Sequence, residues 1–527
     1  MTDLSLAGID WAIVITYFVI LLGIGIWASY FKRNKDKTLF LAGNSLGATS
    51  IGLSMWGTNV GPSMLIASAS AGFTSGVASG NFAWYAFVFI FLLAIVFAPR
   101  YLGAKVMTLP EFMGKRFGKS TRNILAWYTI LTIVISWLAL TLFAGGILVR
   151  QIFGLEMWVS ATILLLISVL FTTMGGLKAV AYTNVFQMGL LIVVSLALTI
   201  VGLNKVGGVN ALVEAVPADY WNLFKPNSDP DFPWLAILLG YPVMGVWFWC
   251  TDQAMVQPVL AAKSLKTGQL GANFCGWLKI LDVAIYIIPG ILCFALVKQG
   301  VFAPLADPDT AYMSMVTNLF PVGMVGLVMA VLTAALVSTV SSALNALSTV
   351  FTMDIYVQKF KPQATNKEII KIGRIVVVIG AVIAIILTLA IDAIKGLNLF
   401  NIFQSVLGFI APPMAAVFLF GVFWKKTTTR AANMCLTWGT VFSLGTGIAY
   451  FLTNTSVDWW PHFMMLSFIL FAVICVGMFL VTLLDKNPIS QDTLDFGVLP
   501  KTPKQVWVVW IALIVVMVTL YIVFNGH

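Results

Sequence analysis

Charge is scarce in this sequence: Asp, Glu, Lys and Arg make up only 9% of its 527 residues, while 60% are hydrophobic. Soluble globular domains carry about a quarter charged residues, so the composition excludes that class. Apolar stretches of about 20 residues, long enough to cross a bilayer as helices, follow one another along most of the chain. The sequence therefore predicts an all-α polytopic membrane protein with about 14 transmembrane helices.

Histidine and cysteine are also scarce. The chain has two His and five Cys, and every Cys lies within an apolar stretch. This number and placement predict neither a disulfide framework nor a His–Cys metal site. The sequence shows no nucleophile–base pair and no cofactor-binding loop, so we expect no enzymatic activity.

Basic residues are distributed unevenly among the segments that join the apolar stretches. Most of the 30 Lys and Arg fall in alternate segments, such as 32–37, 100–122, 359–374 and 425–430. Cytoplasmic segments are enriched in Lys and Arg, so we expect a plasma or inner membrane protein with both termini outside. The net charge of +10 then reflects orientation in the lipid bilayer. It indicates no nucleic-acid partner, and no obligate protein partner is evident.

The segment from Thr58 to Ser63, Thr-Asn-Val-Gly-Pro-Ser, interrupts the apolar stretch 47–73. Unpaired backbone groups are costly in lipid, so a broken helix persists only inside protein or beside a watery cavity. Breaks at this depth are typical of transporter binding sites. A second break is predicted in 233–261, at Gly240-Tyr241-Pro242 with Gly245. Two interrupted stretches, five stretches apart, predict an inverted repeat around a central site.

Four hydroxyl residues lie close together in the stretch 320–351: Ser338, Thr339, Ser341 and Ser342. Ser338, Ser341 and Ser342 share one face of a helix. Hydroxyl and carbonyl oxygens suit a hard cation such as Na⁺. The alternative is that these small residues only allow close helix packing.

Lys279 and Asp282 are charged residues within another apolar stretch, three positions apart and hence on one helix face. Charges inside the membrane are costly and usually pair in the bundle interior. We therefore expect the two to form a pair near the solute pocket. The alternative is a structural ion pair away from the solute.

At this point the sequence resembles the sodium/solute symporters, in the branch of the sodium/glucose cotransporters. The matching segments recur in family order from the first apolar stretch to about residue 430, and they are FLAGNSL (40–46), LPEF (109–112), GGL (175–177), WCTDQ (249–253), FTMDIY (351–356) and GVFWKKT (421–427). The resemblance implies a leucine-transporter-like core of five plus five inverted helices. It also implies Na⁺ as the coupling ion and a small polar solute as the cargo.

The implied core divides the chain into four parts. Residues 1–46 form an additional N-terminal helix and inner loop, and 47–204 form the first repeat. Residues 205–424 form the second repeat with outer loops. Residues 425–527 add three C-terminal helices.

The resemblance places the Na⁺ site on backbone oxygens of Gly57, Val60 and Ala335 and on the hydroxyls of Ser338 and Thr339. Some members hold a second ion, and the corresponding positions here are Ser341, Ser342 and Asn184. Because an amide stands where those members have an acid, we favour one Na⁺ per solute.

Sugar-contact positions are only partly kept. Asn59, Trp249, Lys279 and Gln404 match, whereas the usual acid position is Ala83, the inner-gate tyrosine position is Phe248 and a further polar position is Met64. We expect Asp282 to replace the carboxylate missing at Ala83. The most favoured cargo is a monosaccharide or a related sugar or polyol. Sialic acid, an amino acid or another organic acid remains an alternative, as does proton coupling through Asp282.

A membrane solute sensor or a channel on the same scaffold is the competing class of function. A sensor often carries a soluble signalling domain, and a channel needs a long polar stripe. Neither feature is visible in the sequence, so Na⁺-driven import by alternating access is the preferred interpretation.

Overall fold

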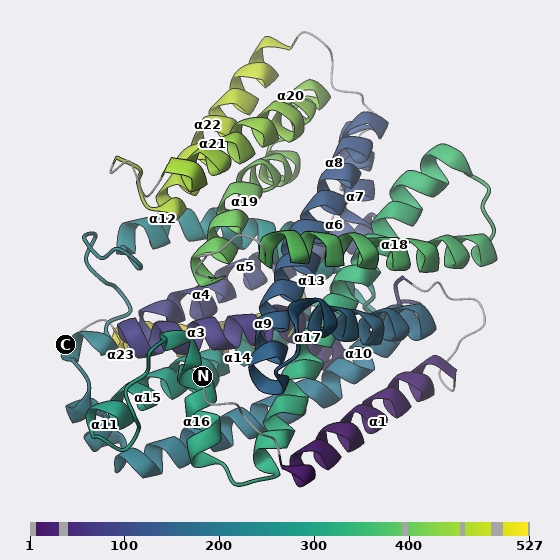
Figure 1. Ribbon diagram of the computed structural model, residues 1–527. Coiled ribbons are helices and arrows are strands. Elements are labelled where there is room, and N and C mark those ends of the chain that lie inside the picture. The colour runs from purple at the N-terminus through teal and green to yellow at the C-terminus, as the bar shows by residue number, and fades with distance from the viewer. Residues whose placement is uncertain (1–6, 31–39, 393–398, 454–458, 486–498, 525–527) are drawn as a thin grey trace.

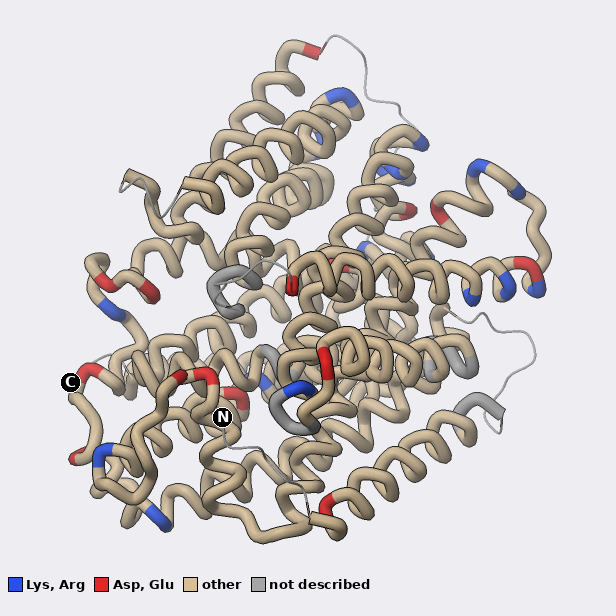
Figure 2. The backbone as a smooth tube through the Cα atoms, in the orientation of Figure 1, with Lys and Arg blue, Asp and Glu red and all other residues tan. Residues whose placement is uncertain are grey.

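The computed structural model describes residues 7–30, 40–392, 399–453, 459–485 and 499–524, and these ranges contain helices and no strand (Figure 1). Twelve of the helical segments are long and apolar enough to cross a membrane. Charged residues lie mostly at helix ends and in connecting segments (Figure 2). The basic cluster predicted at 32–37 lies outside the described residues.

The predicted number of about 14 spans is close to this result, and the two differences have clear causes. The stretch 47–73 is divided between α2 (Ala48–Asn59), which is too short to count, and α3 (Pro62–Ser75), which leads into the next span. The predicted span at 156–174 forms the first part of the continuous helix α10 (Met157–Val206), and within it only the shorter stretch Met157–Leu170 counts as an apolar helix.

Helix α10 (Met157–Val206) holds two of the predicted spans and must bend between them. A straight helix would separate Ser168 and Asn184 by about 24 Å. Ser168 nevertheless donates to the carbonyl oxygen of Val337 at 3.3 Å. Asn184 accepts from Ser338, the residue that follows Val337. The two halves of α10 therefore both lie against the same part of α17 (Met324–Val350).

The remaining helices surround this centre (Figure 1). In the first half of the chain they are α1 (Gly8–Tyr30), α4 (Gly80–Trp84), α5 (Ala86–Leu92), α6 (Ala98–Gly103), α7 (Leu109–Phe117), α8 (Lys119–Thr132) and α9 (Leu140–Phe153). In the second half they are α11 (Val209–Ala215), α12 (Trp234–Gly245), α13 (Gln253–Leu260), α14 (Leu265–Asp282), α15 (Ile288–Lys298), α16 (Ala311–Leu319), α18 (Asn366–Asp392), α19 (Leu399–Phe423), α20 (Thr429–Met434), α21 (Thr440–Thr453), α22 (Phe463–Leu484) and α23 (Lys504–Val523).

The first predicted break is confirmed. Helix α2 ends at Asn59, and α3 begins at Pro62, where proline is favourable because the first helical N–H has no partner anyway. Between them, Val60 leaves the helical conformation with ψ of 76°. Helix α2 packs against α14, α10 and α17, so this break lies inside protein.

The second break lies at Asp252, and the predicted position at Gly240-Tyr241-Pro242 was wrong. Pro242 is accommodated inside α12, which continues into the π-helical segment η5 (Val246–Thr251). Gly240 instead allows close contact with the backbone of Met464, and Gly245 with the ring of Phe89. Asp252 then adopts an extended conformation and caps α13 by accepting from two backbone N–H groups.

Helix α1 is anchored to the start of α17 by one buried carboxylate. Asp10 Oδ1 accepts from the backbone N–H of Gly323 at 2.7 Å and of Gly326 at 2.8 Å. These donors belong to the helix N-terminus, whose N–H groups have no partner within the helix. Asp10 thus fixes the central helix to α1.

Replacing Asp10 with alanine should destabilise the protein by about 1–3 kcal/mol for each buried donor left unpaired. Asp10→Asn keeps an acceptor oxygen and should be milder. Thermal unfolding in detergent measures both variants. Equal stability of Asp10→Ala and the wild type would show that these bonds do not anchor α17.

Candidate functional site

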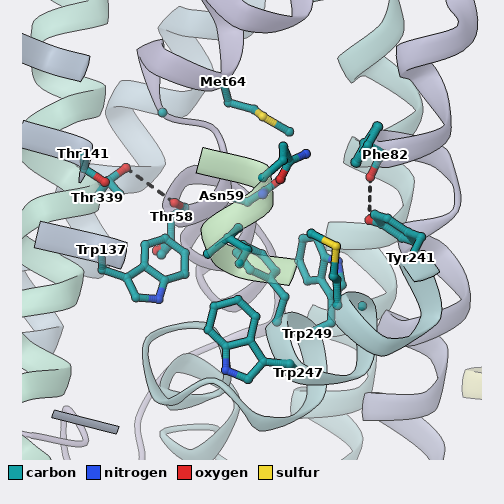
Figure 3. Close-up of a pocket in the computed structure, with 16 residues that line it drawn as sticks. Thr58, Asn59, Met64, Phe82, Trp137, Thr141, Tyr241, Trp247, Trp249 and Thr339 are labelled. Atoms are coloured by element: carbon teal, nitrogen blue, oxygen red, sulfur yellow. Dashed lines mark hydrogen bonds between the residues drawn. The ribbon is translucent and has the colours of Figure 1, made fainter. Parts of the chain in front are cut away.

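One pocket lies beside both helix breaks, between the end of α2 and the segment η5 that precedes Asp252. Figure 3 shows Asn59 and Met64 from the first broken helix facing Trp247 and Trp249 from the second. The walls are aromatic and amide- or hydroxyl-bearing, and the lining residues are Thr58, Asn59, Gly61, Met64, Phe82, Trp137, Thr141, Tyr241, Met244, Gly245, Trp247, Phe248, Trp249, Thr339, Gln404 and Leu407. None of these side chains carries a formal charge.

Backbone carbonyls are released where α2 ends. The N–H of Gly61 donates to the carbonyl of Asn59 at 3.1 Å rather than to that of Gly57. Pro62 has no N–H to offer the Thr58 carbonyl. The carbonyl oxygens of Gly57 and Thr58 therefore lack the helical bonds that would otherwise occupy them.

Hydroxyls of α17 lie against this released end. Thr339 Oγ1 is 3.5 Å from the carbonyl oxygen of Thr58 and donates to the carbonyl of Ala335 at 3.2 Å (Figure 3). The Thr58 hydroxyl donates to that of Ser342 at 3.2 Å. The result is a cluster of oxygen atoms at the junction of α2 and α17, which is the chemistry that hard cations prefer.

The predicted Na⁺ ligands are divided between contacts with α2 and with α10. Ser338 donates to Asn184, and Asn184 donates to Ser54 at 3.3 Å, about one turn before Gly57. Gly57 itself must be small, because an added Cβ would lie 2.7 Å from the side chain of Met188. Thr339 thus contacts the end of α2 directly, whereas Ser338 is linked to α2 through Asn184.

The candidate residues for a second ion have separate partners. Asn184 bridges Ser54 and Ser338, whereas the Ser341 hydroxyl donates to the carbonyl of Ser168 at 3.3 Å. Ser342 accepts from Thr58. The three residues contact three different neighbours, so these hydrogen bonds do not bring their oxygen atoms together around a single ion position.

Lys279 and Asp282 form the expected pair, and the pair lies just behind the pocket wall. Lys279 Nζ bonds to Asp282 and donates to Asn59 Oδ1 at 2.7 Å. The other Asp282 oxygen accepts from Trp56 Nε1 at 2.7 Å. Lys279 Nζ also lies 5.6 Å from the centre of the Trp249 ring, within range of a cation–π interaction.

The structure places the predicted solute residues in two groups. Asn59, Met64, Phe248, Trp249 and Gln404 line the pocket. Ala83, Lys279 and Asp282 are buried and are not part of the lining. Asp282 contacts Lys279 and Trp56 instead of facing the solute space, so its side chain does not occupy the place expected for a direct solute contact.

Sequence reasoning missed several lining residues. Trp137 packs its ring 5.3 Å from that of Phe248 and donates to Asp252 at 3.0 Å. Tyr241 donates to the carbonyl of Phe82 at 2.6 Å (Figure 3). Asp252 itself was a sequence signal for the second helix break, because Asp is favoured at helix N-caps. For Trp137 and Thr141 the sequence gives no signal, because only helix packing brings them here.

Comparison with known proteins gives consistent matches. A family model described as the sodium:solute symporter family matches residues 39–439. The mouse sodium/glucose cotransporter 1 is 30% identical over 90% of this chain and 78% of its own length. The rabbit sodium/myo-inositol cotransporter 2 is 31% identical over 82% of this chain and 68% of its own length.

Solved structures match over nearly the whole chain. A Na⁺-coupled sialic acid symporter in a substrate-bound outward-open state superposes with a TM-score of 0.79 at 20% identity, covering 92% of this chain and 99% of the other. At this identity the likeness concerns the fold alone. It confirms the predicted leucine-transporter-like, all-helical fold.

Proposed function

The chain belongs to the sodium:solute symporter family, and from this premise we propose that it imports a monosaccharide or a related polyol together with Na⁺. Sodium-coupled solute transport is the activity of this family. The proposal concerns the identity of the solute, the residues that bind it and the ion, and a cell-membrane location with both termini outside.

One observation supports coupling between ion and solute: Thr58 and Thr339 belong to both sites. Both residues line the pocket, and both take part in the oxygen cluster between α2 and α17. We assign Na⁺ to the carbonyls of Gly57, Val60 and Ala335 and to the hydroxyls of Ser338 and Thr339. Bound Na⁺ then fixes the end of α2 against α17 and sets the position of Asn59 for the solute.

The chemistry of the pocket favours a neutral, hydroxyl-rich solute. Asn59 and Gln404 offer amide donors and acceptors, and Thr141 offers a hydroxyl. Trp249 and Phe248 present rings 5.1 Å apart, which suit the apolar face of a sugar. Pockets with a few placed polar groups among aromatic walls bind small molecules selectively.

The driving force comes from Na⁺ entry. Each ion that moves inward gains about 2.3 kcal/mol per 100 mV of membrane potential, in addition to its concentration gradient. Alternating access requires the pocket to open to one side at a time. The two broken helices meet at the pocket, and we expect the opening movement to occur there, relative to α17, which also packs against α1, α10 and α18.

A competition experiment tests the solute assignment. Purified protein in liposomes under an inward Na⁺ gradient should accumulate labelled glucose, galactose or myo-inositol. Unlabelled monosaccharides and polyols should compete, whereas sialic acid and amino acids should not. Accumulation of sialic acid or an amino acid, with no uptake of any sugar or polyol, would contradict the proposal.

A further inference from the structure

The positive charge of Lys279 is neutralised by Asp282 in the absence of solute. Its ammonium is bonded to Asp282, and their side chains are only 2% and 4% exposed. The second oxygen of Asp282 accepts from Trp56 at 2.7 Å, which holds the carboxylate in place. A buried charge without a partner is costly inside a membrane, so the pair behaves as one neutral unit.

This neutral unit reaches the solute space through two lining residues. Lys279 Nζ donates to Asn59 at 2.7 Å and lies over the ring of Trp249. An ammonium group has three N–H donors, and Asn59 and Asp282 take two of them. Lys279 therefore acts on the solute space through Asn59 and Trp249, which line the pocket.

The remainder of the pocket supplies no counter-charge. Its sixteen lining residues include amides, hydroxyls, aromatic rings and apolar groups, without a charged side chain. A solute carboxylate near Asn59 would meet Lys279, but it would also face the carboxylate already bonded to Lys279. In a poorly solvated site the two negative charges repel strongly.

We propose that Asp282 determines the charge class of the solute: by neutralising Lys279 it makes the pocket select neutral polyhydroxy solutes and exclude their carboxylates. This inference rests on the proposed function. It assigns Asp282 a role in specificity without direct contact to the solute, so it is a positioning and charge-balancing residue.

The test compares D-glucose with D-glucuronate, which share a pyranose ring and differ by a carboxylate at C6. Asp282→Asn keeps the size of the side chain and an oxygen for Trp56 but leaves Lys279 unbalanced. The ratio of glucuronate to glucose uptake under a Na⁺ gradient should rise about tenfold or more in this variant, a change equivalent to about 1.4 kcal/mol.

Two further variants separate charge balance from structural support. Lys279→Gln combined with Asp282→Asn removes both charges, so the gain in relative glucuronate uptake should disappear. Trp56→Phe removes a hydrogen bond to Asp282 but no charge, so the wild-type preference should remain. A purely structural ion pair would lower the uptake of both solutes and leave their ratio unchanged.

The outcomes distinguish the two proposals. An unchanged ratio in an Asp282→Asn protein that still accumulates glucose overturns the inference, as does a wild type that takes up both solutes equally. If Asp282→Asn does not reach the membrane, Asp282→Ser must show the raised ratio. A wild type that accumulates no monosaccharide or polyol at all contradicts the proposed function instead.

Discussion

Replacing Thr339 with alanine should raise the Na⁺ concentration for half-maximal solute uptake about tenfold, which corresponds to about 1.4 kcal/mol of lost Na⁺ binding. The Thr339 hydroxyl lies 3.5 Å from the released carbonyl of Thr58 and 3.2 Å from that of Ala335. Alanine leaves these oxygens in place but removes the ligand between them. Uptake measured over a series of Na⁺ concentrations gives the shift directly.

Thr333 provides a matched control on the same helix. It is also buried, and its hydroxyl donates to the carbonyl of Met329 at 2.8 Å, within its own helix. Thr333→Ala should leave the Na⁺ dependence unchanged, and Thr339→Ser should retain most of it. If Thr339→Ala and Thr333→Ala showed the same Na⁺ dependence, Thr339 would not be a ligand.

Replacing Gly290 with alanine should abolish most uptake, because α15 and α3 touch at this residue. An added Cβ would overlap the backbone carbonyl of Ala69, and Gly72 faces the carbonyl of Ile287 in the same way. Backbone atoms cannot move aside as a flexible side chain can, so α3 and the adjoining break must shift. Overpacking of this kind typically costs about 1–3 kcal/mol.

Gly189 on α10 is the control for this substitution, because nothing lies within 4 Å of its added Cβ. Alanine in a helix interior is otherwise about 1 kcal/mol more favourable than glycine. Gly189→Ala should therefore be neutral or stabilising in thermal unfolding and should transport normally. Normal transport by Gly290→Ala would show that the α3–α15 contact tolerates a larger separation.

The first helix break was predictable from the sequence, and the second was only partly so. Gly61-Pro62 combines a flexible residue with one that lacks an N–H, so it ends α2. At the second break, Gly240 and Pro242 gave a misleading signal because glycine there serves helix packing and proline is tolerated inside α12. The actual break depends on Asp252, a helix cap without glycine or proline nearby.

Residues joined by local spacing were predicted better than those joined by packing. Lys279 and Asp282 are three positions apart, so the helix places them on one face, where they form an ion pair. Trp137, in the π-helical segment η3 (Ile133–Ala139), and Thr141, in α9, reach the pocket only through helix packing, and no local pattern encodes that arrangement. The division of the chain into repeats at 47–204 and 205–424 stays a prediction.

The central claim is that Na⁺ binds between the end of α2 and the hydroxyls of α17 and thereby drives solute into the pocket. The most direct measurement is accumulation of the transported sugar or polyol in proteoliposomes with inward gradients of Na⁺, K⁺ or choline at equal ionic strength. We expect accumulation above equilibrium with Na⁺ alone, and its loss in a variant with both Ser338→Ala and Thr339→Ala. Equal accumulation with K⁺ or choline, or full Na⁺-driven accumulation by the double variant, would contradict the claim.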